Sequence, residues 1–370
     1  MGVRDLRFPA LEIRTPIVTR RFQRLMTLPP RGGGSEDGAM SGDGEINQEA
    51  VIDALESGAA TGHAQPLARI DTHMSHIFLA PDRVYKLLRN RCHPFADMSG
   101  LAARRRACDA ALSVNGALAP RLYEGVAPVT RDREGRIRLG GEGEVLDWVV
   151  MLRRFPEGAL LDDIARAGGL TSGMIAEAVD AIAAFHAAQP PCPDAGSAEE
   201  VASIVRGLRR TEAGGAARMG AQPAGRDLFA ALDGEVSRLA PIIEARRAAG
   251  WVRRGHGDLH LKNICLFEGR VTPFDALEFD PGLATVDVIY DLAFLLMDLR
   301  ARGLADLATL ARDRYWAASK QPQAARALLP LYMALRAAVR MAVAEEAGDP
   351  AEAARYHALG LEILRARDAS

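Results

Sequence analysis

The stretch that decides the fold of this 370-residue chain reads His256-Gly257-Asp258-Leu259-His260-Leu261-Lys262-Asn263. A second carboxylate, Asp275, follows Asn263 by twelve residues. An Asp, an Asn five positions later and a second Asp are the side chains that phosphoryl transfer from Mg-ATP requires. The first carboxylate orients the attacking hydroxyl and takes its proton, while the amide and the later carboxylate hold metal ions. We therefore expect Asp258 to act as a base, and Asn263 and Asp275 to bind Mg²⁺.

The residues between these groups predict a hairpin. Short strands over residues 263–267 and 270–274 flank Glu268-Gly269, and they should bring Asp275 back beside Asn263. An isolated Asp or Asn in a loop more often caps neighbouring backbone amides. The joint spacing of the three residues favours the metal and proton-transfer roles over capping. Glu278 is a further candidate, acting through a water molecule, with an ordinary surface carboxylate as the alternative.

The composition narrows the class of protein. The net charge of −2 gives no reason to expect nucleic acid or an anionic membrane as a partner. No apolar run in the sequence approaches the roughly 20 residues of a membrane-spanning helix. The four cysteines are scattered and form no Cys-x-x-Cys pair. This usage is typical of a reducing compartment, so we expect a cytoplasmic protein. The sequence does not indicate the oligomeric state.

The order of predicted elements indicates an α+β fold with two lobes. Residues 1–45, rich in Arg, Pro and Gly, should form a disordered extension. Residues 46–152 should form a small β-rich N-lobe, and residues 153–370 a larger, mostly helical C-lobe. Strands are expected over residues 67–70, 75–79, 84–88, 126–130, 136–139 and 145–153.

Apolar residues at helical spacing predict the remaining elements. Helices are expected over residues 48–55, 98–118, 160–166, 172–188, 228–249, 287–302, 304–318, 324–346 and 350–367. The helix over residues 98–118 should be interrupted near Gly100, because glycine is a poor helix former. Loops are expected over residues 193–200 and 214–225.

Lysine is rare in this chain: only three of the 46 basic residues are lysines, namely Lys86, Lys262 and Lys320. Lys86 lies in the apolar strand predicted over residues 84–88. An ammonium there can reach the α- and β-phosphates of a nucleotide beneath the sheet. The alternative is a strand lysine that faces solvent, and solvent exposure is what we expect of Lys262 and Lys320.

Four motifs occur in an order that resembles the aminoglycoside phosphotransferase family: Val84-Tyr85-Lys86, Val149-Val150-Met151, the stretch at 256–263, and Asp275. The resemblance covers residues 47–345. It is narrower with a subgroup of bacterial phosphotransferase-like proteins of unknown substrate, which carry Thr-His-x-Ser and Asp-Ala-x-Glu-Phe motifs. Those motifs read Thr72-His73-Met74-Ser75 and Asp275-Ala276-Leu277-Glu278-Phe279 here. Longer members add a nucleoside-triphosphatase-like domain, and this sequence contains no Walker-type Gly-x-x-x-x-Gly-Lys.

The resemblance implies a two-lobed protein-kinase-like fold that uses ATP or GTP with Mg²⁺. It implies that Met151 lies at a hinge beside the nucleotide, and that Thr72 and Ser75 contact phosphates. No Gly-x-Gly-x-x-Gly is present, so an ordinary strand pair around Thr72 and Ser75 is an equal alternative. His73 and His76 are as well explained by packing.

The sequence departs from the family pattern at one position. A kinase-like lysine is normally oriented by a Glu from the following helix, and this chain has Ala111-Leu112 there. Asp109 lies about 200° around the helix and is a poor substitute. Glu124 is another possible partner. If neither reaches Lys86, the lysine is unpaired and catalytic efficiency is in doubt.

The neighbours of Asp258 have supporting roles in this interpretation. His256 should brace the loop through hydrogen bonds to the backbone. One of Asp287 and Asp291 should cap the following helix and hold the loop from below, with Asp291 favoured as structural. His260 stands where protein kinases place a lysine that contacts the γ-phosphate, so it is a second candidate catalytic residue.

The leading hypothesis is a phosphotransferase whose acceptor is a hydroxyl group of a small molecule. Its acceptor cleft should involve the helices after Asp287 and the segment around Asp162-Asp163, where acidic groups would suit a cationic acceptor. No Ala-Pro-Glu motif of a protein kinase is present. The alternative is a nucleotide-binding pseudokinase that acts as a scaffold or sensor. A third hypothesis, a metallohydrolase using His256, Asp258 and His260, lacks the later Gly-Asn-His motif.

Overall fold

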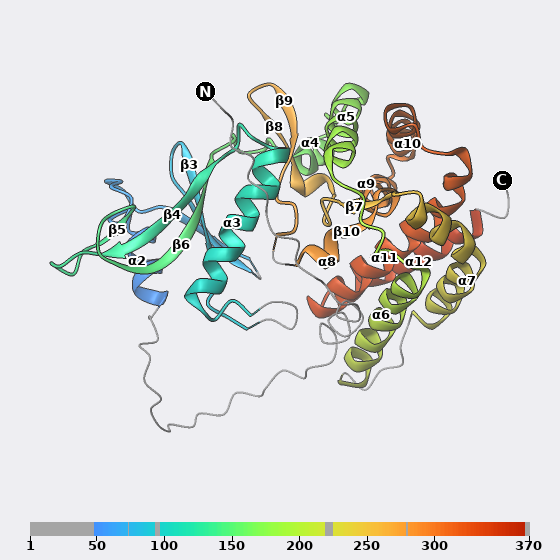
Figure 1. Ribbon diagram of the computed structural model, residues 1–370, viewed down its shortest axis with the longest axis horizontal. Coiled ribbons are helices and arrows are strands. Elements are labelled where there is room, and N and C mark those ends of the chain that lie inside the picture. The colour runs from blue at the N-terminus through green and yellow to red at the C-terminus, as the bar shows by residue number, and fades with distance from the viewer. Residues whose placement is uncertain (1–47, 73, 93–96, 219–224, 279, 367–370) are drawn as a thin grey trace.

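The computed structural model describes residues 48–72, 74–92, 97–218, 225–278 and 280–366. Within these residues an N-terminal antiparallel sheet precedes a largely helical region (Figure 1). The predicted fold class is therefore confirmed. The extension predicted over residues 1–45, and His73, lie outside the described residues.

The N-terminal sheet has six strands in the order β1-β2-β3-β6-β4-β5, and every neighbouring pair is antiparallel. All six predicted strands are present, with shifts of a few residues at their ends. The long strands β4 and β6 pair with two register shifts, which allow them to bend. The bounds are β1 Ala68–Asp71, β2 Ser75–Leu79, β3 Arg83–Leu88, β4 Tyr123–Arg131, β5 Ile137–Leu139 and β6 Glu144–Arg153.

Two helices cover the two faces of this sheet. Helix α2 (Gln48–Glu56) packs on the face that carries Tyr85, and helix α3 (Leu101–Leu118) packs on the opposite face, with Leu88. Gly100 is the extended residue that precedes α3, so the helix begins just after the predicted interruption. Because side chains alternate along a strand, Lys86 lies on the α3 face, which is continuous with β8 of the helical region.

The helical region begins after β6. Its helices are α4 Leu161–Arg166, α5 Ser172–Ala188, α6 Ala198–Arg218, α7 Arg226–Ala248, α8 Pro281–Ala284, α9 Val288–Ala301, α10 Ala305–Ser319, α11 Leu329–Glu346 and α12 Pro350–Ala366. Two 3₁₀ helices, η1 Leu261–Asn263 and η2 Gln323–Leu328, and two strand pairs complete it. The pairs are β7 Val252–Arg254 with β10 Thr285–Asp287, and β8 Ile264–Phe267 with β9 Arg270–Pro273.

One prediction in this region was wrong. Residues 193–200 and 214–225 were expected to be loops, yet α6 runs from Ala198 to Arg218. Val201, Val205 and Leu208 pack into the main core, so tertiary burial stabilises a helix whose glycine-containing end suggested a loop. The short elements α8, β7 and β10 were also not predicted.

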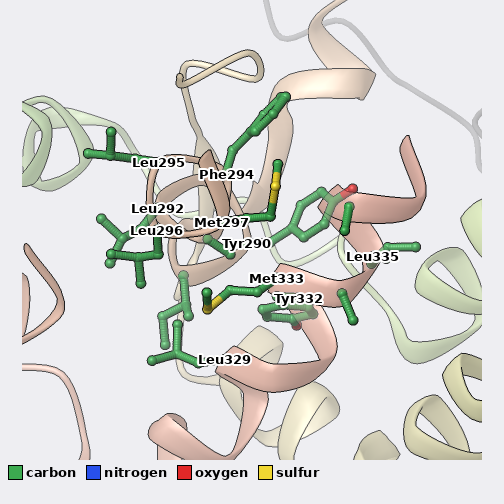
Figure 2. Packing of buried hydrophobic residues seen from close by; sticks show 14 of the residues in the cluster. Tyr290, Leu292, Phe294, Leu295, Leu296, Met297, Leu329, Tyr332, Met333 and Leu335 are labelled. Atoms are coloured by element: carbon green, nitrogen blue, oxygen red, sulfur yellow. The ribbon is translucent and has the colours of Figure 1, made fainter. Parts of the chain in front are cut away.

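The largest core lies where α9 crosses α11, with side chains of both helices interdigitating (Figure 2). Every residue from Val288 to Leu299 is buried. The segment Gln323–Glu346 is long and apolar enough to cross a membrane, but 72% of its apolar window is buried inside the fold. This burial explains its apolar composition as that of a core helix. Residues of both α9 and α11 hydrogen-bond to the backbone of the stretch at 256–263.

Candidate active site

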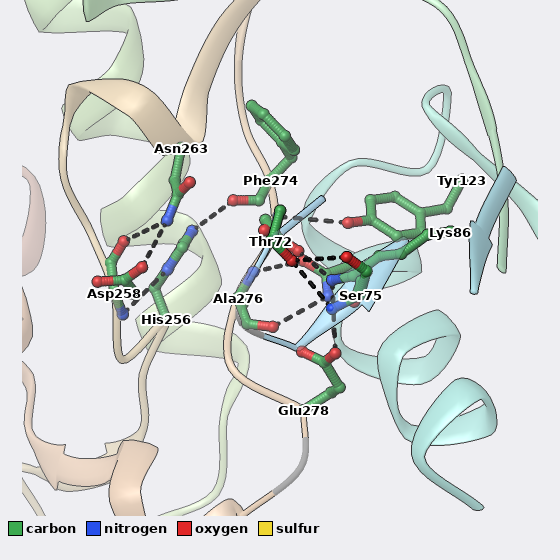
Figure 3. A network of polar contacts seen from close by, with 12 residues as sticks. Thr72, Ser75, Lys86, Tyr123, His256, Asp258, Asn263, Phe274, Ala276 and Glu278 are labelled. Atoms are coloured by element: carbon green, nitrogen blue, oxygen red, sulfur yellow. Dashed lines mark hydrogen bonds and ion pairs between the residues drawn. The ribbon is translucent and has the colours of Figure 1, made fainter. Parts of the chain in front are cut away.

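Asp258 and Asn263 lie on one loop, between β7 and β8 (Figure 3). The Asn263 side chain donates from Nδ2 to the backbone oxygen and to Oδ2 of Asp258, each at 2.9 Å. Nε2 of His260 lies 3.3 Å from the same carboxylate oxygen. The 3₁₀ turn η1 therefore brings all three predicted residues of this loop into direct contact.

Two aspartates of the following helix divide the roles that the sequence assigned to one of them. Asp287 caps α9 by accepting from the amide of Ile289 at 2.9 Å, and it pairs with Arg246. Asp291, fully buried, accepts from the amides of His256 at 2.8 Å and Gly257 at 2.7 Å. Asp287 therefore positions the helix, and Asp291 holds the loop from below.

The charge of Asp291 is balanced inside the core. His186 contacts it from Nε2 at 2.9 Å, while Nδ1 of His186 contacts the hydroxyl of Tyr315 at 2.7 Å. Burial alone would raise the pKa of Asp291, but the hydrogen bond and charge of His186 lower it below its usual range. Asp291 is therefore an anion that anchors the loop. His186 was not identified from the sequence.

His256 braces the loop as predicted. Its Nε2 donates to the backbone oxygen of Phe274 at 2.8 Å, and its Nδ1 accepts from the amide of Asp258 at 3.3 Å. Burial lowers the pKa of His256, which favours the neutral ring. Both ring nitrogens are thus engaged with backbone, which argues against the metallohydrolase hypothesis. The described part of the chain also contains no group of three or more His, Cys, Asp or Glu side chains arranged to hold a metal ion.

Lys86 joins the sheet to the helical region. Its Nζ lies 2.7 Å from Oδ1 of Asp275 and 3.5 Å from Oε1 of Glu278 (Figure 3). Burial would lower the pKa of Lys86, but these two carboxylates overcome that effect and raise it well above its usual value. Lys86 is therefore a firmly charged ammonium that faces the large lobe, and the solvent-facing alternative is excluded.

Glu278 supplies Lys86 with the second carboxylate partner that α3 does not provide. Asp109 pairs with Arg105 at 2.7 Å, and Glu124 pairs with Arg83 at 2.7 Å, so neither of the considered substitutes contacts Lys86. The Glu278 side chain is only 6% exposed and is not the surface carboxylate considered as an alternative. The expectation that Lys86 would be unpaired without Asp109 or Glu124 was wrong, because its partner comes from the large lobe.

The backbone around Asp275 is held by residues of the small lobe. Asp275 has a left-handed φ of 59°, and its amide donates to the hydroxyl of Tyr123 at 3.3 Å. Asn115 of α3 donates to the oxygen of Ala276 at 3.2 Å and accepts from its amide at 2.7 Å. These contacts fix the direction of the Asp275 side chain. Asn115 was missed, although an Asn in the interior of an Ala-rich helix is a detectable signal.

The two predicted metal ligands lie at adjacent positions of the β8–β9 hairpin. The register pairs Ile264 with Pro273, and the amide of Phe274 donates to the oxygen of Asn263 at 2.9 Å. Asp275 is thus one residue beyond the partner of Asn263. The two bonds from Asn263 to Asp258 leave its amide oxygen available, and the Asp275 side chain is 41% exposed. The Asn263 amide oxygen, in a buried residue, and the exposed Asp275 carboxylate are the hard oxygens that suit a Mg²⁺ ion with waters and nucleotide phosphates as its other ligands.

Comparison with known proteins places this geometry in a structural class. A choline/ethanolamine kinase family protein from Mesorhizobium loti superposes with a TM-score of 0.52 at 15% identity, covering 88% of this chain and 100% of the other. A choline kinase from Cryptosporidium parvum gives a TM-score of 0.53 at 10% identity, covering 87% and 96%. The chain has the protein-kinase-like fold of these kinases. This fold is the one implied by the resemblance read from the sequence.

The sequence comparisons are less specific about function. No protein-family model matches the sequence. Uncharacterized proteins of Mycobacterium tuberculosis and Mycobacterium bovis are 30% identical over 278 residues. That match covers 74% of this chain and 53% of each relative, so the chain spans about half the length of these relatives.

Thr72 and Ser75, predicted to contact nucleotide phosphates, lie at the connection from β1 to β2 of the sheet. Thr72 and Ser75 close a turn, in which the amide of Ser75 donates to the Thr72 hydroxyl at 2.9 Å. Ser75 pairs with Leu88 and so shares the sheet face of Lys86, where its hydroxyl is buried without a hydrogen-bond partner among the described residues. A ligand group beneath the sheet would satisfy this hydroxyl.

Met151 is not brought together with the other predicted residues. It pairs with Tyr85 in the sheet and packs with the cluster under α2, on the face opposite Lys86. A nucleotide contact by Met151 therefore has no support from the position of its side chain. The alternation of β6 instead places Val150 and Leu152 on the face of Lys86.

The electrostatic state of Asp258 suits a proton acceptor. Burial would raise its pKa, but the charge and hydrogen bond of His260, with His256 and Arg336 nearby, lower it below the usual range. Arg336 also donates to the backbone oxygen of Gly257 at 3.2 Å, from α11 below the loop. The carboxylate is thus ionised at neutral pH, and its side chain remains 38% exposed to an incoming group.

Proposed function

We propose that this protein is a phosphotransferase that moves the γ-phosphoryl group of ATP, with Mg²⁺, to a hydroxyl of a small molecule. The observation that carries the proposal is the 2.7 Å contact between Lys86 of the small lobe and Asp275 of the large lobe. In this proposal the Lys86 ammonium binds nucleotide phosphates, and the neighbouring Asp275 carboxylate binds the metal. The proposed base, Asp258, accepts a hydrogen bond from Asn263, whose backbone oxygen accepts from the amide of Phe274, the residue before Asp275.

Each residue has a defined task in this mechanism. Asp258 accepts the proton of the acceptor hydroxyl as its oxygen forms a bond to the γ-phosphorus and the bond to the bridging oxygen of ADP breaks. Lys86, oriented by Glu278, binds the α- and β-phosphates, and Asn263 and Asp275 hold the metal. Mg-ATP, when bound, supplies the phosphoryl group and the cationic charge that stabilises the transferring oxygens. GTP would serve the same chemistry.

The names of two structural neighbours support a small acceptor. Both are described as choline kinases or members of that kinase family, and they share this fold across nearly their whole length. The pseudokinase alternative rested on the missing helix carboxylate. The position of Glu278 weakens that argument, since a buried carboxylate does contact Lys86.

The test separates the enzyme from the pseudokinase. Thermal-shift measurements with ATP and GTP, each with and without Mg²⁺, should reveal a nucleotide that stabilises the protein. Phosphotransfer to a panel of hydroxyl compounds should then be lost in Asp258→Asn by about 10²- to 10⁴-fold, with nucleotide binding retained. Asp109→Asn is the matched control, because it removes an exposed carboxylate of α3 that contacts only Arg105. Tight nucleotide binding without transfer to any acceptor would favour the pseudokinase.

A further inference from the structure

A pocket of about 80 Å³ opens beside the stretch at 256–263. Its walls come from η1, α9, α11 and α12, so the large lobe alone forms it. Its charged lining, with His260 not counted, consists of four basic and two acidic side chains: Lys262, Arg302, Arg340, Arg355, Asp298 and Glu352.

His260 connects this pocket to the proposed base. It lines the pocket, and its Nε2 lies 3.3 Å from Oδ2 of Asp258. Its ring packs edge-on against Phe294, another wall residue, with 5.2 Å between ring centres. The other ring nitrogen, Nδ1, is buried and has no hydrogen-bond partner in the described ranges. Only the His260 side chain therefore separates a molecule in the pocket from Asp258. A polar group of that molecule could form a hydrogen bond with Nδ1 of His260.

The acidic side chains of the pocket are already engaged by the protein. Asp298 accepts from the amide of Leu261 at 3.0 Å and from Nε of Arg302 at 3.2 Å. Glu352 lies between two arginines, 3.7 Å from Arg340 and 3.4 Å from Arg355. Neither carboxylate is available to bind a cationic ligand without losing these contacts.

The acidic residues of the segment expected to form part of the acceptor cleft are engaged as well. Asp162 is buried and pairs with Arg166 at 2.6 Å and with Arg302. Asp163 pairs with the same Arg166 at 2.6 Å. The expected acidic character of this segment is thus cancelled by arginines.

The basic side chains are in excess. Four cations against two anions leave a net charge of +2 on the lining, with His260 not counted. Glu352 serves two arginines at once, and Lys262 is exposed and takes part in no ion pair with another described residue. An arginine fork and an ammonium held near an apolar wall are the donors that carboxylates and phosphates prefer.

We propose that this pocket binds the acceptor through an anionic group, so that the substrate is a hydroxyl compound bearing a carboxylate or a phosphate. This inference rests on the proposed phosphotransferase function and specifies its acceptor. Lys262, Arg340 and Arg355 hold the anionic group, and the hydroxyl of the same molecule reaches Asp258 past His260. An acceptor with several positive charges is repelled by the same side chains.

The first experiment compares acceptors that differ mainly in charge. Glycerol 3-phosphate, glycerate, glycerol and choline are offered at equal ionic strength, and both thermal stabilisation and Mg-ATP-dependent phosphorylation are measured. The two anionic compounds should bind at least about tenfold more tightly than glycerol, since a charge-assisted hydrogen bond contributes that much. Comparing them also identifies which anion the pocket prefers. Equal or tighter binding of choline would overturn the proposal.

The second experiment changes the pocket. Arg340→Gln and Lys262→Gln should each weaken binding of the preferred anion about tenfold, and Glu352→Gln should strengthen it because it frees two arginines. Arg365→Gln is the matched control: it is an exposed arginine of α12, about 15 Å along the helix from Arg355. Anion binding that is unchanged in all three pocket variants would contradict the proposal.

The two proposals fail in different ways. Anion binding that depends on Arg340 and Lys262, without any phosphotransfer, would refute the enzymatic function and leave the anion pocket standing. Phosphotransfer to neutral or cationic alcohols that is insensitive to these two substitutions would do the opposite.

Discussion

Oε1 of Glu278 lies 3.5 Å from Nζ of Lys86, and both side chains are largely buried between the sheet and the helical region. In a protein-kinase-like site the lysine is usually oriented by a carboxylate on the helix of its own lobe. Here the carboxylate comes from the segment that follows Asp275, the proposed metal ligand. The orientation of Lys86 therefore depends on the relative position of the two lobes, and not on a rotation of α3.

Replacing Glu278 tests this dependence. In Glu278→Gln, Asp275 is the remaining carboxylate partner of Lys86 among the described residues, and in the proposed mechanism Asp275 binds the metal once Mg-nucleotide is present. We expect the KM for nucleotide to rise about tenfold, the effect of losing one hydrogen bond to a charged group. Steady-state kinetics with varied ATP measure it. Glu124→Gln, which removes an exposed partner of Arg83, should leave the KM unchanged. A KM equal to that of the wild type in both variants would show that Glu278 does not orient Lys86.

Asn115 provides a test of how the Asp275 backbone is held. Asn115→Ala removes both hydrogen bonds to Ala276 and leaves a buried amide and carbonyl without partners. The free energy of unfolding should fall by about 2 to 4 kcal/mol. Urea unfolding measures this change. Ser113→Ala, an exposed position of the same helix, should change stability by less than about 0.5 kcal/mol. A loss for Asn115→Ala no larger than for Ser113→Ala would exclude the proposed support.

The proposed roles of Asp275 as a metal ligand and Asp258 as a base predict different responses to Mg²⁺ when each is replaced. In Asp275→Asn, the Mg²⁺ concentration required for nucleotide-induced stabilisation should rise about tenfold, because a neutral amide is a poorer ligand than a carboxylate. In Asp258→Asn, the required Mg²⁺ concentration should stay that of the wild type, and only phosphotransfer should be lost. Thermal-shift titration with MgCl₂ at fixed nucleotide distinguishes them. If the two variants show the same Mg²⁺ dependence, Asp275 does not bind the metal.

Asp291 predicts a specific dependence of stability on pH. Its pKa is lowered in the folded protein relative to its ordinary value of 3.8, so the folded state favours the carboxylate. The resulting stabilisation is fully present above pH 3.8 and is lost as the pH falls through the lower folded pKa. Asp291→Asn should cost about 3 kcal/mol or more near pH 7, since it removes the charged member of a buried network.

Urea unfolding of wild type and Asp291→Asn between pH 7 and pH 3 measures this effect. The difference between the two proteins should be constant above the ordinary Asp range and should shrink below it. Asp180→Asn is the control: its carboxylate pairs with Arg314 at an exposed site, where ion pairs contribute roughly 0 to 1 kcal/mol. A difference between wild type and Asp291→Asn that does not change with pH would contradict the assigned anionic state.

The sequence predicted those parts of the molecule whose signals are local. The alternation of apolar residues in strands β1 to β6 and the helical spacing of α5 and α7 depend on neighbours along the chain, and these elements lie where they were expected. The loop with Asp258 and Asn263 was found because its side chains are also neighbours along the chain. Helix α6 was missed because its stability comes from contacts with α7 and α11, which are distant in sequence.

The parts of the site that were missed depend on contacts between distant segments. Glu278 was predicted to be a surface carboxylate or to act through a water molecule. Nothing in the adjacent sequence indicates that it contacts Lys86 of β3. Asn115 and Tyr123 approach Asp275 and Ala276 only when the two lobes meet. Met151 was placed by resemblance, and the pairing of β3 with β6 puts its side chain on the other face. The register of a sheet decides such an assignment, and it was not available from the motif.

The contact between Lys86 and Asp275 has a consequence for how ligands enter. One carboxylate serves as counter-ion to an ammonium before a divalent cation arrives, so the arrival of Mg-nucleotide is an exchange of partners and not a simple addition. Lys86 and Asp275 form an ion pair that joins the sheet to the helical region. Measured nucleotide affinity then reports the difference in free energy between the contacts formed with Mg-nucleotide and the ion pair that is given up.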